Sequence, residues 1–301
     1  MNKIRLIFIH GISASVVDYD YSATLCNMMT QKLTELGVIP ENATEEEISD
    51  IITYEHVNYS AIGHEEEVRL FDVYERETAK LYNFVYRISK VSGLDKVRRQ
   101  IITSVGDVMV YMSDYWGDQI RGMVLDKINP YIASGDAVSL ISHSLGSVVA
   151  FDTLYHNIRN NPDWQAARFK PANLFTMGSP LALFSMDLDR ETGAQKEKFK
   201  EGAEPEMPDI PDSPGLKLVQ DDGVWYNFLD AQDIIAYPLG ALFEGKFKVD
   251  DIVVQTGTNP RKAHDGYWEN QEVVDVVCTR LKMDFQRINT EDAAEEAVAQ
   301  A

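Results

Sequence analysis

The segment "SLISHSLGSVVAFDTL", residues 139–154, constrains the fold of this chain more than any other stretch. It is an apolar run interrupted at its centre by Ser142, His143, Ser144, Leu145 and Gly146. A buried strand that turns sharply into a buried helix needs small residues at the turn, because the two backbones approach each other closely there. We therefore predict a tight strand-to-helix turn at 142–147, with the Ser144 side chain exposed at its tip.

Predicted strands and helices alternate along the rest of the chain. The predicted strands lie at 4–10, 51–59, 137–142, 173–178, 224–229 and 252–256. The first of them is apolar except for Arg5, as expected of a strand covered on both faces. Helical patterns separate most of the strands, so the sequence predicts an α/β fold with a mostly parallel central sheet and helices on both faces.

We predict one domain over residues 1–289, interrupted by two irregular regions. Helical periodicity predicts a helical insertion at about 60–132, whose apolar side chains we assign mainly to the core and partly to an acyl pocket. The polar segment at about 187–222 is too long for an ordinary connection, and we predict a mobile flap near the mouth of the site. Residues 290–301 form an acidic, alanine-rich tail, expected to be a frayed helix or a loose end.

Charge and composition argue against several classes of function. The formal net charge of -20 produces a field that repels phosphate, so we expect no binding to nucleic acid. Cys26 and Cys278 lie far apart, and neither metal-binding nor nucleotide-binding spacings occur, so we expect no metal and no cofactor. The sequence carries no information on the oligomeric state.

The N-terminal stretch "MNKIRLIFIHG" has the pattern of a first strand and not that of a signal peptide. No stretch approaches the 18 or more uninterrupted apolar residues of a transmembrane helix, so we expect no transmembrane segment. Together these features predict a soluble, cytoplasmic protein.

A serine at a strand-to-helix turn of this kind, called a nucleophile elbow, is suited to acyl transfer. The turn lifts the hydroxyl clear of the sheet, and the amide of Leu145 at the helix N-terminus points toward a developing oxyanion. Ser142 stands where a glycine is usual and is a small replacement for it. Taken alone, the segment is equally compatible with an ordinary helix start in which Ser144 is the N-cap.

Acyl transfer also needs a histidine base, a carboxylate that orients it and a second oxyanion donor. Asp233 follows the predicted strand 224–229, and His264 follows the strand after it, which gives the order serine, acid, histidine. Ile12, after the first strand, is placed where its amide can reach the same oxyanion as Leu145. His10 beside it is expected to brace that loop.

Other residues remain candidates for the same roles. Asp230 lies three residues before Asp233, and Asp187 and Asp189 follow the preceding strand; each is an alternative acid. The alternative bases are His143, whose side chain is expected to point away from Ser144, and His156 on the following helix.

The chain resembles the α/β-hydrolase superfamily and, within it, the lipase-like and esterase-like serine hydrolases of bacteria. The resemblance is carried by "FIHG" at 8–11, "SHSLGS" at 142–147, "MGSPLALF" at 177–184, "WYNFLDAQDIIAYPL" at 225–239 and "AHDGYW" at 263–268. It implies Ser144 as nucleophile, His264 as base, Asp233 as acid, and the amides of Ile12 and Leu145 as oxyanion donors.

The implied activity is that of a serine hydrolase, which cleaves a carboxylic ester with an apolar acyl group through an acyl-enzyme. An acyltransferase or a thioesterase would use the same three side chains. A binding protein that keeps the fold without turnover is a third alternative, and the complete, correctly ordered set of residues argues against it.

Overall fold

The structure is a computed structural model and describes residues 2–11, 21–62, 108, 110–188 and 216–299. The predicted oxyanion donor Ile12, most of the predicted helical insertion and most of the predicted flap lie outside these residues.

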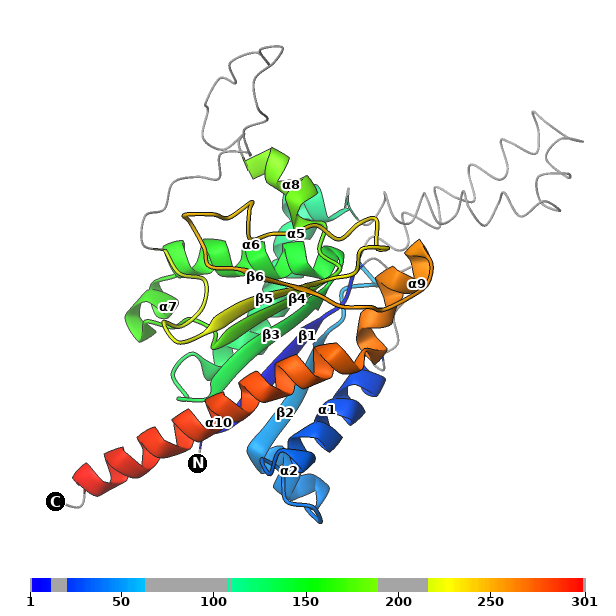
Figure 1. The fold of residues 1–301 in the computed structure, drawn as a ribbon. Helices are drawn as coiled ribbons and strands as arrows, with labels where there is room; N and C mark the ends of the chain where they lie inside the picture. The colour runs from blue at the N-terminus through cyan, green and yellow to red at the C-terminus, as the bar shows by residue number, and fades with distance from the viewer. Residues whose placement is uncertain (1, 12–20, 63–107, 109, 189–215, 300–301) are drawn as a thin grey trace, which may run out of the picture.

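A parallel sheet occupies the centre of the described fold, which confirms the predicted fold class (Figure 1). Its six strands follow the order β2-β1-β3-β4-β5-β6. They are β1 (Ile4–Ile9), β2 (Ile52–Val57), β3 (Ala137–His143), β4 (Asn173–Met177), β5 (Val224–Leu229) and β6 (Asp250–Val253). Every residue of β3 and β4 is buried, because these central strands have neighbours on both edges and helices on both faces.

Two layers of helices cover the sheet (Figure 1). Helices α1 (Ala23–Glu35) and α10 (Gln271–Ala299) pack on one face, and α5 (Asp114–Ile128) and α6 (Leu145–Asn160) pack on the other. Successive side chains of a strand point to opposite faces, and β1 illustrates the result. Leu6 and Phe8 belong to the core under α1 and α10, whereas Ile7 and Ile9 belong to the core under α5 and α6.

The remaining helical elements are short and lie at the ends of the layers. They are α2 (Glu45–Ile51), α7 (Pro162–Ala167), α8 (Leu181–Leu188), α9 (Pro260–Asp265) and the 3₁₀ turns η1 (Asn129–Tyr131) and η2 (Gly266–Glu269). Both α9 and η2 follow β6 at the carboxyl edge of the sheet, which is the edge where parallel sheets bind their ligands.

Three segments differ in detail from the sequence prediction. The last strand ends at Val253 and not at residue 256, because the backbone N–H of Thr256 bonds to the side chain of Asp230 at 2.6 Å. Residues 216–222 of the predicted flap pack on the domain: Leu218 is buried, and Gln220 donates from its backbone to Pro171 at 2.9 Å. In the predicted acidic tail, the backbone of 290–299 continues α10.

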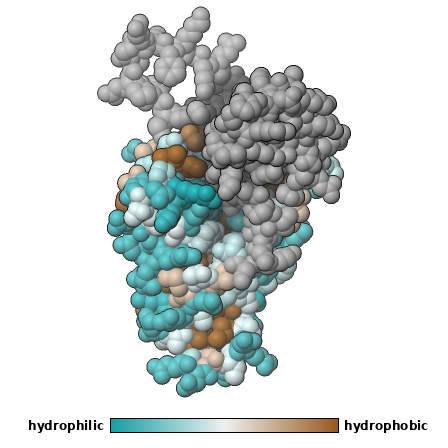
Figure 2. All heavy atoms as spheres, turned by 90° about the vertical axis from the view of Figure 1, so that its right-hand side faces the viewer, coloured by the Kyte–Doolittle hydropathy of each residue, from teal (hydrophilic) through white to brown (hydrophobic). Residues whose placement is uncertain are grey.

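The surface agrees with the acidic composition. Figure 2 shows that the described part of one face is mainly hydrophilic, with hydrophobic side chains gathered in small separate patches. Among the helices that the structure describes, no segment is both long and apolar enough to cross a membrane.

Candidate active site

Ser144 lies at a strained backbone turn between β3 and α6. Its φ of 53° and ψ of -129° place a non-glycine residue in a region that side chains avoid, at a cost of about 1–3 kcal/mol. The backbone N–H of Ser144 is held by the Met177 carbonyl at 3.0 Å, so the turn is fixed to the neighbouring strand β4. This is the geometry that a nucleophile elbow requires. The sequence predicts an exposed Ser144 at the tip of the turn, but the residue is buried, with only 4% of its surface exposed.

Two glycines allow β1 and the elbow to pack together closely. A Cβ on Gly146 would lie 2.3 Å from the carbonyl oxygen of His10, so only glycine lets α6 begin this close to β1. A Cβ on Gly11 would lie 2.5 Å from the Cβ of Ser144. The chain therefore passes directly beside the serine at Gly11, one residue before the predicted oxyanion donor Ile12.

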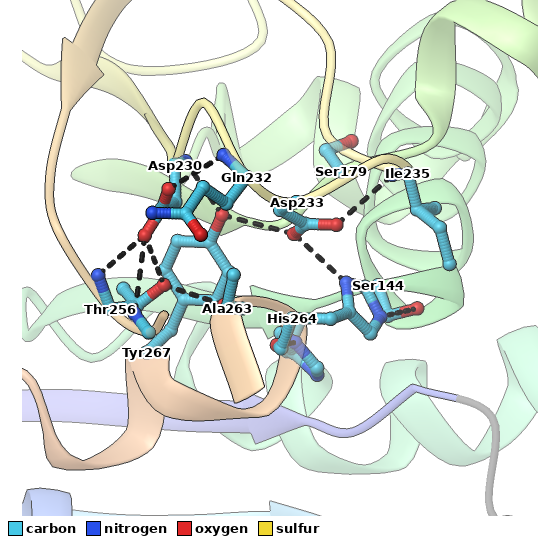
Figure 3. A network of polar contacts seen from close by, with 12 residues as sticks. Ser144, Ser179, Asp230, Gln232, Asp233, Ile235, Thr256, Ala263, His264 and Tyr267 are labelled. Atoms are coloured by element: carbon cyan, nitrogen blue, oxygen red, sulfur yellow. Dashed lines mark hydrogen bonds and ion pairs between the residues drawn. The ribbon is translucent and has the colours of Figure 1, made fainter. Parts of the chain in front are cut away.

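The structure brings Ser144, His264 and Asp233 into one hydrogen-bonded chain (Figure 3). The Nε2 atom of His264 lies 2.9 Å from the Ser144 hydroxyl, and its Nδ1 lies 2.9 Å from Oδ2 of Asp233. Since a carboxylate can only accept, Nδ1 carries the proton of the neutral ring. Nε2 is then free to accept the proton of the serine hydroxyl, which is the arrangement that a general base needs.

Asp233 is buried, and three donors hold its carboxylate. Oδ2 accepts from His264 and from the Tyr267 hydroxyl at 3.0 Å, and Oδ1 accepts from the backbone N–H of Ile235 at 3.0 Å. Burial by itself raises the pKa of Asp233, but the hydrogen bond and charge of His264, together with these other donors, lower the pKa below its ordinary value. The carboxylate is therefore ionised and can stabilise a protonated His264.

Asp230, the alternative acid nearest to Asp233 in the sequence, contacts a different loop. Its carboxylate accepts from the backbone N–H groups of Gln232 at 2.8 Å and Thr256 at 2.6 Å. Burial raises its pKa, and these backbone hydrogen bonds outweigh burial, so the pKa of Asp230 is also lowered. Asp230 thus ties the segment that leads to His264 onto the end of β5.

The remaining alternatives from the sequence are Asp187, Asp189 and His156. Asp189 lies outside the described residues, and Asp187 lies in the last turn of α8. His156 lies on α6 with its ring 5.7 Å from that of Tyr155.

His143 supports His264 through a hydrogen bond and a ring contact. Its Nε2 lies 2.6 Å from the backbone carbonyl of His264, to which it donates, and the two rings lie 4.7 Å apart. Burial, with a further contribution from the neighbouring His264, lowers the pKa of His143 to about 3, so this ring stays neutral.

The candidate oxyanion site lies at the start of α6. Leu145 is the first residue of α6, and the first N–H groups of an α-helix have no partner within the helix. His10 braces the adjoining end of β1: its ring stacks on Tyr59 at 4.2 Å, and its Nδ1 donates to the Gly11 carbonyl at 2.7 Å. Burial lowers the pKa of His10, which leaves this ring neutral.

Sequence reasoning did not single out Tyr267 or Gly178. Tyr267 follows His264 by three residues in "AHDGYW", but that spacing alone does not indicate a hydrogen bond to the acid. Gly178 has a φ of 57°, and a Cβ there would lie 2.9 Å from Oδ2 of Asp233. The only sequence signal for Gly178 is a glycine at the last position of the predicted strand 173–178.

The described residues hold no candidate metal centre, and the chain has no matching family model. The described residues contain no group of three or more His, Cys, Asp or Glu side chains that could hold a metal ion. No protein-family model matches the chain.

Two yeast proteins are similar to part of the chain. A protein of Schizosaccharomyces pombe named as a probable mitochondrial phospholipase is 29% identical over 107 residues, which cover 33% of this chain and 14% of that protein. A protein of Saccharomyces cerevisiae with the same description is 26% identical over 133 residues, covering 37% of this chain and 18% of that protein. The chain therefore matches less than a fifth of the length of either relative.

Among solved structures, ClbQ from the colibactin NRPS/PKS pathway is 11% identical, with a TM-score of 0.40 over 95% of this chain and 100% of that one. The strand order and the positions of three side chains define the architecture. A parallel sheet with this strand order carries a strained serine turn after β3, an aspartate after β5 and a histidine after β6. The chain has the α/β-hydrolase fold.

Proposed function

We propose that the protein is a serine hydrolase that cleaves a carboxylic ester. The observation that carries the proposal is the continuous hydrogen-bonded chain from the Ser144 hydroxyl through His264 to Asp233, with both distances at 2.9 Å. This chain begins at the strained backbone turn of Ser144.

In the proposed reaction, Oγ of Ser144 attacks the ester carbonyl carbon while Nε2 of His264 takes the hydroxyl proton. The negative charge on the carbonyl oxygen is stabilised by the N–H of Leu145, with Ile12 proposed as the second donor. His264 then returns the proton to the departing alcohol. Water, activated by the same histidine, hydrolyses the acyl-enzyme and regenerates Ser144.

Two observations favour a lipid ester as substrate. Both yeast relatives are named as probable phospholipases, although the match covers only part of each. Large apolar side chains are exposed in segments that follow the carboxyl ends of the strands: Ile234, directly after Asp233, is 74% exposed, and Leu183, on the helix α8 after β4, is 43% exposed. An apolar acyl chain gains free energy by covering such side chains.

Labelling and kinetics with Ser144→Ala test the proposal. Wild-type protein should react with a fluorophosphonate probe at one serine and hydrolyse p-nitrophenyl esters, with a preference for longer acyl chains. Ser144→Ala should lose the label and lower kcat by at least ~10³ while the thermal unfolding transition persists. Ser134→Ala, which changes an exposed serine in the turn after η1, is the matched control and should behave as wild type.

Near-normal turnover by folded Ser144→Ala would refute the assignment of the nucleophile. Product analysis with added alcohol or thiol acceptors separates hydrolysis from acyl transfer, because the same acyl-enzyme is then captured by the acceptor instead of water.

A further inference from the structure

Tyr267 occupies an unusual position beside the proposed catalytic residues (Figure 3). It lies in η2, is completely buried, and follows His264 by three residues. Its hydroxyl oxygen accepts from the backbone N–H of Asp230 at 2.9 Å, and the hydroxyl donates to Oδ2 of Asp233 at 3.0 Å. One side chain therefore contacts both aspartates at the end of β5.

The direction of these hydrogen bonds follows from their partners. A backbone N–H can only donate, so the Tyr267 oxygen is the acceptor toward Asp230. The phenol proton is left for Asp233, whose ionised carboxylate can only accept. Burial, reinforced by the charge of Asp233, raises the pKa of Tyr267 well above its ordinary value, so the donor keeps its proton throughout the working pH range.

We propose that Tyr267 is a positioning residue that orients Asp233 toward His264 and limits how strongly this carboxylate stabilises the protonated histidine. The inference rests on the proposed function, because it assigns a role within the same set of side chains. It goes beyond that function by adding a fourth member that sequence reasoning did not find.

Orientation is the first part of the role. Three donors hold the two carboxylate oxygens of Asp233, from His264, Tyr267 and the Ile235 backbone. Without the tyrosine hydroxyl, only one donor other than the histidine itself remains, and the carboxylate can turn about its terminal torsion, which is broad for aspartate. The distance from Oδ2 to Nδ1 of His264 is then less tightly fixed.

Charge sharing is the second part. Tyr267 and His264 donate to the same oxygen, Oδ2, so the phenol takes up part of the negative charge that otherwise interacts with the imidazolium. Removing the hydroxyl should strengthen the attraction between Asp233 and protonated His264. The base then stays protonated to a higher pH, and the pH at which activity is half-maximal should rise.

The other titratable and charged groups around His264 keep their side-chain contacts when the tyrosine hydroxyl is removed, although the backbone N–H of Asp230 loses its acceptor. They are His143 from β3, Asp230 from the end of β5, Lys262 and Asp265 from α9, and Ser144 at the elbow. His143 is neutral and the Asp230 carboxylate is engaged by backbone N–H groups, so neither offsets the expected effect.

The test is the pH dependence of ester hydrolysis by Tyr267→Phe, which removes one oxygen and keeps the ring. We expect kcat to fall about 10- to 100-fold with KM within about twofold of wild type, because a small displacement of a catalytic group costs up to this factor. The midpoint of the kcat/KM profile should move upward by a few tenths of a pH unit or more. Tyr226→Phe, on β5 with its ring against Phe175 at 6.0 Å, is the matched control and should change neither quantity.

A double-variant cycle shows whether Tyr267 acts through Asp233. In an Asp233→Asn background, Tyr267→Phe should cause little further loss of kcat, because the carboxylate that it orients is already gone. Losses that multiply in the double variant would overturn the proposal. An unchanged pH midpoint in folded Tyr267→Phe would also overturn it, even if stability falls, since a purely structural hydroxyl leaves the midpoint in place.

A second substitution covers the case in which Tyr267→Phe does not fold. Incorporation of 3-fluorotyrosine at position 267 nearly preserves the shape and makes the hydroxyl a stronger donor, so the midpoint should move downward; an unchanged or raised midpoint would contradict the proposal. Ser144→Ala tests the proposed function separately. If that variant keeps full activity, the proposed function is wrong. If wild type is labelled and active but Tyr267→Phe has an unchanged pH midpoint, only the role of Tyr267 is refuted.

Discussion

Gly178→Ala should disable the proposed catalytic residues without replacing any of them. Gly178 directly follows β4 and has a φ of 57°, so a side chain there costs about 1–2 kcal/mol from the backbone alone. The added Cβ would also lie 2.9 Å from Oδ2 of Asp233, 2.9 Å from Cε2 of Tyr267 and 3.2 Å from Nδ1 of His264. All three atoms belong to side chains of the hydrogen-bonded network around the proposed acid.

The size of the effect follows from these distances. Restoring an ordinary contact of 3.4 Å from 2.9 Å requires Asp233 to move by at least 0.5 Å, the difference between the two values. A movement of that size opens the 2.9 Å hydrogen bond between Asp233 and His264. We therefore expect kcat to fall by about 10- to 100-fold, the range typical of a catalytic group that is misplaced by a fraction of an ångström to 1 Å.

Gly37→Ala is the matched control for the cost of the backbone conformation. Gly37 follows α1 with a φ of 73°, and apart from its chain neighbours no atom lies within 4 Å of the position that an added Cβ would take. Urea unfolding should show a similar loss of stability, about 1–2 kcal/mol, from the positive φ in both variants. Only Gly178→Ala should lose activity on p-nitrophenyl esters. If folded Gly178→Ala has a kcat within twofold of that of Gly37→Ala, the close approach of Gly178 to the acid has no catalytic consequence and the reasoning fails.

Two further predictions concern the aspartates and the base. Asp233→Asn should lower kcat by about 10³ to 10⁴, because an amide can hold the histidine in the wrong tautomer, whereas Asp230→Asn should lower kcat far less. Steady-state kinetics of the two variants measure this difference, and the opposite ranking would make Asp230 the acid. Asp230→Asn should instead lower stability, since its carboxylate accepts backbone N–H groups. The folded-state pKa of Asp230 is lowered, so its contribution to the free energy of unfolding is present above about pH 4 and is lost as the pH falls through the folded-state pKa. Urea unfolding from pH 7 to pH 3 should therefore show a shrinking difference in stability between wild type and Asp230→Asn. Finally, kcat/KM should rise with pH through a midpoint of about 6 to 7, as expected when a histidine must be neutral to act, and a flat profile from about pH 5 to 9 would exclude a histidine base.

Local patterns in the sequence are sufficient to predict the elements of the fold and the chain order of the candidate residues. The alternation of buried strands and helices follows from hydrophobic periodicity, which is a local property. The tight turn at 142–147 could also be predicted from a local pattern, because a close strand-to-helix approach requires small residues at fixed positions. In the structure, Gly146 lies against the carbonyl of His10, as this argument requires. The positions of Asp233 and His264 after successive strands could also be predicted, because parallel strands bring their carboxyl ends to one edge.

The contacts between the candidate side chains, in contrast, depend on how distant parts of the chain pack together. Asp230 and Asp233 are three residues apart in the same loop but have different partners. These partners come from the segment after β6, where Thr256 donates to Asp230 and His264 donates to Asp233. The same segment places the Tyr267 hydroxyl on Oδ2 of Asp233 and leaves room only for a glycine at position 178. These contacts join residues that are 26 to 89 positions apart along the chain (Asp230 to Thr256, and Gly178 to Tyr267), so no local pattern encodes them. They are fixed by the close packing of three loops at one edge of the sheet.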